Sequence, residues 1–120
     1  VAVALNKNRK ETTRISLVDK IRVCFTLREN PIASAGEKAV FMRVQRPDSL
    51  VITDSPNNLF DFKGDKLIYS ASRKVDYLNQ DVEMCIFLDN TGDFIPGVYS
   101  VGLYLEGSLI GRSNLVLKSR

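Results

Sequence analysis

Residues 94–118 read FIPGVYSVGLYLEGSLIGRSNLVLK, and this stretch decides the fold of the chain. Side chains on a β-strand alternate between two faces, so apolar residues at every second position mark a half-buried strand. One face of this stretch carries the apolar side chains of Tyr99, Val101, Leu103 and Leu105. Glu106-Gly107 then supplies the glycine that a tight hairpin turn needs, and a second apolar run follows. The stretch predicts a loop, a strand, a two-residue turn and a strand.

The second strand of this hairpin contains a conflict in the direction of its side chains. Counted from the turn, Arg112 would face the core, whereas Leu115 and Leu117 would face solvent. One extra residue in the strand, a β-bulge, reverses the direction of all later side chains. We therefore expect a β-bulge between residues 111 and 114.

Alternating apolar and polar residues indicate further strands along the chain. The clearest segments are residues 20–28, 39–45, 66–74 and 82–88. Turn-forming Pro, Gly, Asp and Asn residues separate them, and short apolar runs at residues 1–6 and 50–53 add to the count. The spacing predicts an all-β chain, an immunoglobulin-like β-sandwich of seven to eight antiparallel strands in two sheets. The predicted core residues are Ile21, Val23, Phe25, Leu27, Val40, Met42, Val44, Val82, Met84, Ile86, Val101, Leu103 and Leu105.

The composition is that of one folded domain spanning residues 1–120. Hydrophobic residues make up 44% of the chain and charged residues 26%, which is ordinary for a globular protein. No apolar run approaches the roughly 20 residues that cross a bilayer. Because the sequence begins at Val1 without a Met, we expect a piece of a longer chain with any targeting or anchoring segment upstream.

The absence of histidine limits the chemistry of the chain. It excludes Ser-His-Asp and Cys-His nucleophilic sites and His-ligated zinc. We predict no enzyme, no catalytic residues, no cofactor and no metal site. Asp89, Asn90, Thr91 and Asp93 around Gly92 resemble part of a calcium loop, but the full spacing and the final Glu are missing, so a turn is the favoured interpretation.

The charge balance does not indicate a nucleic-acid partner. The chain has 17 basic and 14 acidic residues, a net charge of +3. The densest basic cluster, Lys7, Arg9, Lys10 and Arg14, fits either a solvated loop or a phosphate-binding patch, and the loop is favoured. Aromatic residues do not alternate with it as a stacking platform requires.

Cys24 and Cys85 each lie within a predicted strand, out of phase with its apolar row. If their strands are neighbours in one sheet, the two sulfur atoms meet on its outer face. Two interpretations stay open, a disulfide between adjacent strands and a pair of reduced thiols, and the demanding geometry of such a disulfide slightly favours the thiols.

The facing of four aromatic residues is not determined by the pattern. An exposed row of rings on one sheet would suit a sugar or a protein partner, whereas scattered partial exposure is the commoner arrangement. These residues are Tyr69, Tyr77, Phe87 and Tyr104.

Residues 21–49 and 69–118 also carry a family resemblance. Their distinctive parts are the Cys24 strand ending in Glu29-Asn30-Pro31, the Arg46-Pro47-Asp48 turn, the strand around Cys85, and Pro96-Gly97-Val98-Tyr99. The chain resembles the C-terminal domain of uncharacterised bacterial proteins, in which a membrane-anchored or coiled-coil segment precedes an immunoglobulin-like sandwich. This resemblance implies no catalytic residues.

The tetrapeptide Pro96-Gly97-Val98-Tyr99 is similar to the start of the sixth strand in fibronectin-like domains. There a tyrosine hydroxyl latches the preceding loop, which implies Tyr99 for that role, while its phase with Val101 fits a plain core residue equally well. We expect a non-catalytic interaction module at the end of a longer cell-envelope protein, on the periplasmic side, with a protein partner. The alternatives are a carbohydrate-binding module and a cytoplasmic nucleic-acid-associated domain.

Overall fold

The computed structural model describes residues 2–27, 36–77, 81–92, 94–105 and 107–119. Nine strands and one 3-10 helix, η1 (Ile15–Leu17), lie within these residues, where the sequence predicts seven to eight strands. The strands are β1 (Ala2–Leu5), β2 (Lys20–Leu27), β3 (Gly36–Gln45), β4 (Leu59–Phe62), β5 (Asp65–Ile68), β6 (Ala71–Tyr77), β7 (Val82–Asp89), β8 (Gly97–Leu105) and β9 (Ser108–Leu117).

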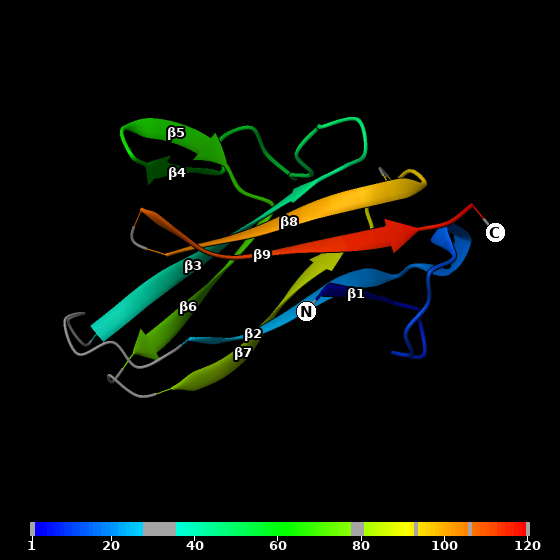
Figure 1. Cartoon of the computed structure of the whole chain (residues 1–120), viewed down its shortest axis with the longest axis horizontal. Helices are drawn as coiled ribbons and strands as arrows, with labels where there is room; N and C mark the ends of the chain where they lie inside the picture. The colour runs from blue at the N-terminus through cyan, green and yellow to red at the C-terminus, as the bar shows by residue number, and fades with distance from the viewer. Residues whose placement is uncertain (1, 28–35, 78–80, 93, 106, 120) are drawn as a thin grey trace.

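Seven of these strands form two antiparallel sheets that pack face to face (Figure 1). One sheet has the order β1-β2-β7, and the other has the order β6-β3-β8-β9. This is the immunoglobulin-like β-sandwich that the sequence predicts. The remaining two strands, β4 and β5, pair only with each other and form a hairpin beside the larger sheet (Figure 1).

The strand count differs from the prediction at three places. β4 is an additional strand, residues 50–53 make only an isolated bridge between Val51 and Gln45 where a strand was predicted, and the segment predicted as one strand at residues 66–74 becomes two. The structure divides it between β5 and β6, because Ser70 turns the chain toward β3. The Ser70 N–H donates to Met42 O at 2.7 Å, and its buried hydroxyl accepts from the Val44 N–H at 2.8 Å. The hairpin before this point turns at Lys63-Gly64, whose φ angles of 51° and 88° belong to a type I′ turn.

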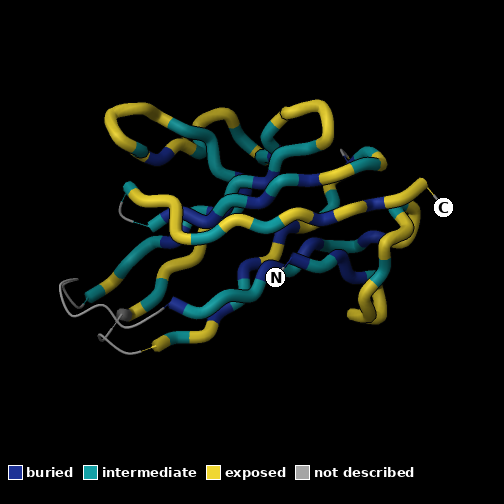
Figure 2. Tube along the Cα trace, in the orientation of Figure 1, coloured by how far each residue is buried: buried dark blue, intermediate teal, exposed yellow. Residues whose placement is uncertain are grey.

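The core lies between the two sheets and contains all thirteen predicted residues. Ten of them are buried, and Phe25, Val82 and Leu105 are partly buried against the same cluster. Figure 2 shows the buried residues concentrated where the two layers face each other. The core also takes in residues that the prediction did not include: Ala2, Ala4, Val18, Ile52, Leu88, Phe94, Tyr99, Leu115 and Leu117.

The β-bulge occurs in β9, but one position before the predicted range. Leu103 pairs with Gly111 and Tyr104 pairs with Leu109, so Ile110 is the extra residue. A Cβ on Gly111 would lie 3.6 Å from the Leu103 side chain, so the shift places the smallest residue against it. Every later side chain changes direction, and Leu115 and Leu117 are buried as a result.

The β4–β5 hairpin covers the outer face of the larger sheet with aromatic rings. Phe60 stacks on Phe41 with ring centroids 4.8 Å apart and contacts Tyr104 at 5.1 Å. Phe62 approaches Tyr104 edge-on at 5.2 Å, and Tyr69 packs against Phe41 at 5.0 Å. Tyr104 is therefore buried under the hairpin, although it points away from the main core.

Candidate binding groove at an open edge of the sandwich

The sandwich has two long edges, and β1 and β9 border the first. We call it the stitched edge, because residues 11–15 cross from one sheet to the other along it. The Thr12 N–H donates to Ala4 O at 2.9 Å, and Thr13 O accepts from the Lys118 N–H at 2.6 Å. The Ile15 N–H in turn donates to Lys118 O at 2.8 Å. A hollow of about 490 Å³ remains beside this segment, which forms part of its wall.

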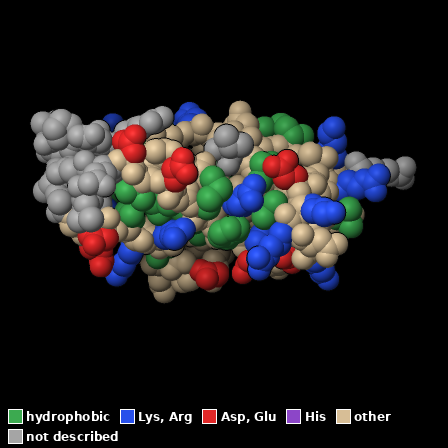
Figure 3. All heavy atoms as spheres, turned by 90° about the horizontal axis from the view of Figure 1, so that it is seen from below, with side chains coloured by type: hydrophobic (Ala, Val, Ile, Leu, Met, Phe, Trp, Pro, Cys, Tyr) green, Lys and Arg blue, Asp and Glu red, His purple; other side chains and the backbone are tan. Residues whose placement is uncertain are grey.

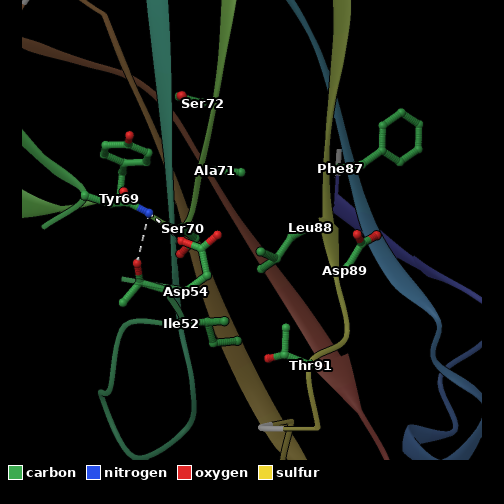
Figure 4. A pocket seen from close by; sticks show the side chains of 12 residues that line it. Ile52, Asp54, Tyr69, Ser70, Ala71, Ser72, Phe87, Leu88, Asp89 and Thr91 are labelled. Atoms are coloured by element: carbon green, nitrogen blue, oxygen red, sulfur yellow. Dashed lines mark hydrogen bonds between the residues drawn. The ribbon is translucent and has the colours of Figure 1, made fainter. Parts of the chain in front are cut away.

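The second long edge, which we call the open edge, runs between β6 and β7. β7 ends the three-stranded sheet, and β6 ends the four-stranded sheet above it. The two strands are in contact but do not pair. A side chain bridges the two strands here, because Arg73 Nη1 donates to Cys85 O at 2.7 Å. Above this contact the strands border a groove of about 490 Å³, which we call the edge groove (Figure 4).

The lining of the edge groove is mostly polar, and Ile52, Ala71 and Leu88 supply the apolar part of its wall. Figure 4 shows Leu88 directed toward the β6 side, with Ala71 and Ile52 across from it. The Asp54 carboxylate points into the space between the strands, whereas Phe87 and Asp89 extend from the other face of β7 (Figure 4). The lining residues with polar side chains are Thr53, Asp54, Asn58, Tyr69, Ser70, Ser72, Asp89 and Thr91.

Local hydrogen bonds hold Asp54 in its position on the groove wall. Asn58 Nδ2 donates to Asp54 Oδ1 at 2.6 Å and lies 3.5 Å from Thr53 Oγ1. The Thr53 hydroxyl donates to Ser55 O at 2.9 Å, which closes a tight loop around the aspartate. These contacts orient a solvent-exposed carboxylate toward the groove without neutralising its charge.

The backbone of β7 offers hydrogen-bonding groups to the edge groove. The Cys85 carbonyl points across the open edge, because it accepts the Arg73 bond. Backbone N–H and C=O groups of alternate residues point to the same side of a strand, so Phe87 and Asp89 direct theirs the same way. An edge strand of this kind is a template on which another strand can pair.

The outer face of the smaller sheet continues this surface. Figure 3 shows this side of the molecule, where hydrophobic groups lie among Lys and Arg side chains and acidic groups. Phe87 is half exposed there, directly across from Arg22 in the strand register. Lys20 Nζ lies 5.9 Å from the centroid of the Phe87 ring and 3.9 Å from Asp19 Oδ2.

The structure joins Cys24 and Cys85 by a disulfide bond. The two residues are direct partners in the β2–β7 register, with their Cα atoms 4.0 Å apart, and they lie on the outer face of the sheet. The sequence analysis gave a slight preference to reduced thiols over this arrangement. The disulfide fixes β7 to β2 at the residue whose carbonyl accepts the Arg73 bond.

Tyr99 is a fully buried residue whose hydroxyl contacts the backbone just upstream. It donates to Ile95 O at 2.6 Å and accepts from the Ile95 N–H at 2.7 Å. These bonds are those of a tyrosine latch, and the ring also packs in the core, so the two roles considered from the sequence coexist. Burial raises the pKa of the hydroxyl above its ordinary value, with the Ile95 backbone bond opposing the shift.

The two remaining sequence motifs form local turns. Asn90 Oδ1 accepts from the Gly92 N–H at 2.8 Å and its Nδ2 donates to Val18 O at 2.9 Å, while Asp93 lies outside the described residues. Within the described part of the chain no three His, Cys, Asp or Glu side chains gather as metal ligands would. The basic cluster lies on an exposed loop and its flank, where Asn6 Oδ1 accepts from the Asn8 and Lys10 N–H groups.

Sequence reasoning did not find the residues of the edge groove. Asp54 and Asn58 lay in a predicted loop, and Ser72 lay in a predicted strand. The signal that was present is the surplus of oxygen-bearing side chains in residues 53–58 and 89–91, but their neighbourhood depends on the order of strands in the sheets.

Comparisons with other proteins assign no role to these residues. No curated protein and no solved structure matches the chain. A family model described as a domain of unknown function matches residues 1–118. In the described residues, no helix has the length and apolar character needed to cross a membrane.

Proposed function

The chain belongs to this family, DUF8428, and we propose that it is a non-catalytic interaction module that binds an extended polypeptide segment in the edge groove. The observation that carries the proposal is the outward-facing backbone of β7 at Phe87 and Asp89, opposite an edge strand that does not pair with it. A peptide that adds a strand to a sheet gains main-chain hydrogen bonds, and its alternate side chains enter pockets. The apolar part of the groove wall, formed by Leu88, Ala71 and Ile52, accepts the inward-facing ones.

The disulfide supports a location in an oxidising space. Disulfides between exposed strands persist outside the reducing cytosol, and Cys24 and Cys85 lie on an outer face. We therefore propose that the module works in an oxidising compartment, with the periplasmic side of the cell envelope as the candidate location.

A carbohydrate-binding module is the second candidate, because the groove walls carry hydroxyl, amide and carboxylate groups. Sugar sites add an aromatic ring on which the sugar stacks. Phe87 points away from the groove (Figure 4), and Tyr69 packs against Phe41. Neither ring is therefore positioned for a sugar to stack on it inside the groove. For this reason we consider a peptide ligand before a carbohydrate.

Amide hydrogen exchange, followed by NMR, tests the proposal. The probe is a capped peptide of alternating Thr and Val, seven residues long, and the control peptide has a central Pro that blocks strand pairing. The Thr-Val peptide should slow exchange of the Phe87 and Asp89 amides at least about tenfold, with no change at Thr12 on the stitched edge. If millimolar peptide protects neither amide and a glycan array identifies a saccharide ligand, the peptide-binding proposal is wrong and the carbohydrate-binding module replaces it.

A further inference from the structure

We infer that the Cys24–Cys85 disulfide is a site of thiol–disulfide exchange, where a small thiol that carries carboxylate groups attacks Cys85 and releases Cys24. Both cysteines are partly exposed, and they line a hollow of about 660 Å³ on the outer face of the smaller sheet. This volume is of the order found in small-molecule sites. Exposed disulfides exchange more readily than buried structural ones. A thiol can therefore reach the bond in the folded domain, whether or not the edge groove holds a ligand.

The sheet leaves the approach to Cys85 open. In exchange, a thiolate attacks one sulfur from the side opposite the sulfur that leaves. β7 is the last strand of its sheet, so among the described strands none of the same sheet lies beside Cys85 on the side away from Cys24. Cys24 belongs to β2, the middle strand of that sheet. Cys85 is therefore the sulfur that an incoming thiol meets at the open edge.

Arg73 places a positive charge beside this approach. Its Nη1 donates to Cys85 O at 2.7 Å, and its side chain lines the same hollow as the disulfide. A guanidinium attracts both a thiolate and the carboxylates of the molecule that carries it. Glu83 also lines the hollow and opposes this attraction, so we expect a modest preference for anionic thiols that salt weakens.

Arg22 can stabilise the charge on the sulfur that leaves. It lies two positions before Cys24 on β2, on the outer face, where its partner in the register is the half-exposed Phe87. Arg22 Nε is buried and has no hydrogen-bond partner within the described part of the chain. Such orphaned donors are rare in folded proteins. Release of Cys24 as a thiolate supplies an acceptor beside this donor, and a neighbouring cation favours the thiolate form.

The exchange conserves bonds and electrons. The incoming thiolate forms a bond to Cys85 Sγ, the bond between the two protein sulfurs breaks, and its electron pair leaves on Cys24 Sγ. Attack by the Cys24 thiolate on Cys85 Sγ restores the disulfide and expels the small thiol. If a second small thiol attacks the first one instead, both cysteines become reduced, and the two small thiols supply the two electrons and form their own disulfide.

Reaction of the intact, oxidised domain with glutathione tests the inference. Cysteamine, which carries an ammonium group instead of carboxylates, is the comparison thiol. After correction for the thiolate fraction of each, glutathione should react at least about threefold faster at about 20 mM salt and within about twofold of cysteamine at about 300 mM. Acid quenching, alkylation and peptide mapping by mass spectrometry should find glutathione on Cys85 and the alkyl group on Cys24.

Matched variants assign the roles of the two arginines. Arg73→Met should reduce the preference for glutathione to less than about twofold, while Lys74→Met, which removes an exposed cation from the same strand, should retain it. Arg22→Met should slow both thiols alike. In the Cys85→Ser background it should also raise the pH at which the thiolate absorbance of Cys24 appears. Circular dichroism melting checks that each variant folds.

The dependence on urea shows whether the bond reacts in the folded state. We expect a rate that changes little in low urea. A bond reached only by global unfolding would react at least about a thousandfold more slowly than in the unfolded chain and would accelerate as urea lowers the stability. That result would overturn the inference. Glutathione found on Cys24, or a preference for glutathione retained by folded Arg73→Met, would also contradict it.

Discussion

The two long edges of the sandwich are closed by different means. At the stitched edge, residues 11–15 join β1 and β9 through backbone hydrogen bonds, such as that from the Thr12 N–H to Ala4 O at 2.9 Å. At the open edge, an Arg73 side chain reaches Cys85 O at 2.7 Å, and the strand below it is held by a disulfide within its own sheet. One edge is thus closed by the chain itself, while the other leaves backbone groups available to a ligand.

The largest effect should come from removing the covalent support of β7. The paired substitution Cys24→Ala and Cys85→Ala opens a crosslink between residues 61 apart, and we expect it to lower the free energy of unfolding by about 2–4 kcal/mol. Urea denaturation of oxidised protein, reduced protein and the double variant measures this. Reduction should destabilise the wild type and leave the variant unchanged. Equal midpoints for all three would mean that backbone pairing with β2 suffices at the open edge.

The Tyr99 latch should have the next largest effect, because it fixes the connection that leaves the open edge after β7. Tyr99→Phe leaves the Ile95 N–H and C=O without their partner, at an expected cost of about 1–3 kcal/mol. Thermal and urea unfolding at neutral pH measure the loss. A cost below about 0.5 kcal/mol would show that solvent replaces the hydroxyl.

The same residue makes a prediction about pH. Burial raises the Tyr99 pKa in the folded state, so its contribution is complete below the unfolded value of 10.0 and is lost as pH rises through the folded value. The wild type should therefore lose stability relative to Tyr99→Phe above about pH 10. Parallel stability curves for the two proteins across that range would contradict the assignment.

The stitched edge should be sensitive to loss of a single backbone donor. Thr12→Pro removes the N–H that bonds Ala4 O, and we expect a cost of about 1–2 kcal/mol. Thr12→Ala keeps that N–H and loses the weaker acceptance from the Arg14 N–H at 3.1 Å, so its cost should be a few tenths of a kcal/mol. Exchange of the Lys118 amide should rise in the Pro variant. Equal stability of the two variants would show that this stitching is dispensable.

The smallest effect is expected for Arg73→Met at the open edge. The side chain is exposed, so losing its bond to Cys85 O should cost less than about 1 kcal/mol. Lys74→Met on the same strand, exposed and paired with Glu37 at 3.5 Å, is the matched control. A loss above about 2 kcal/mol for Arg73→Met would make the two edges equivalent in strength.

The core could be predicted from sequence because it depends on local alternation. Ile21 and Val23, or Met42 and Val44, occupy every second position of one strand, and the same face of each strand enters the core. The presence of a β-bulge could also be predicted, because without one Leu115 and Leu117 would face solvent. Its position at Ile110 is a matter of register with the neighbouring strand β8, in which Leu103 pairs with Gly111 and Tyr104 with Leu109, and the sequence of β9 alone does not fix that register.

The edge groove could not be predicted, because it is defined by strands that end their sheets. Asp54, Ser72 and Asp89 are distant in sequence and line the same groove only because of the order of the strands in the two sheets. Tyr104 shows the same limit. The alternation of β8 places its side chain on the face away from the main core. The hairpin of residues 59–68 covers it there, and no pattern in the sequence around Tyr104 predicts those ring contacts.

The type I′ hairpin of β4 and β5 has a consequence for how copies of this domain could meet. Its Phe60 ring lies on Phe41 and beside Tyr104, so the chain shields from water two rings that the larger sheet would otherwise display. The shielding covers only part of this face, because Val98 and Val116, which are partners in the same sheet, stay about half exposed. A contact between two copies through this face would therefore have to use the end of the sheet away from β4 and β5.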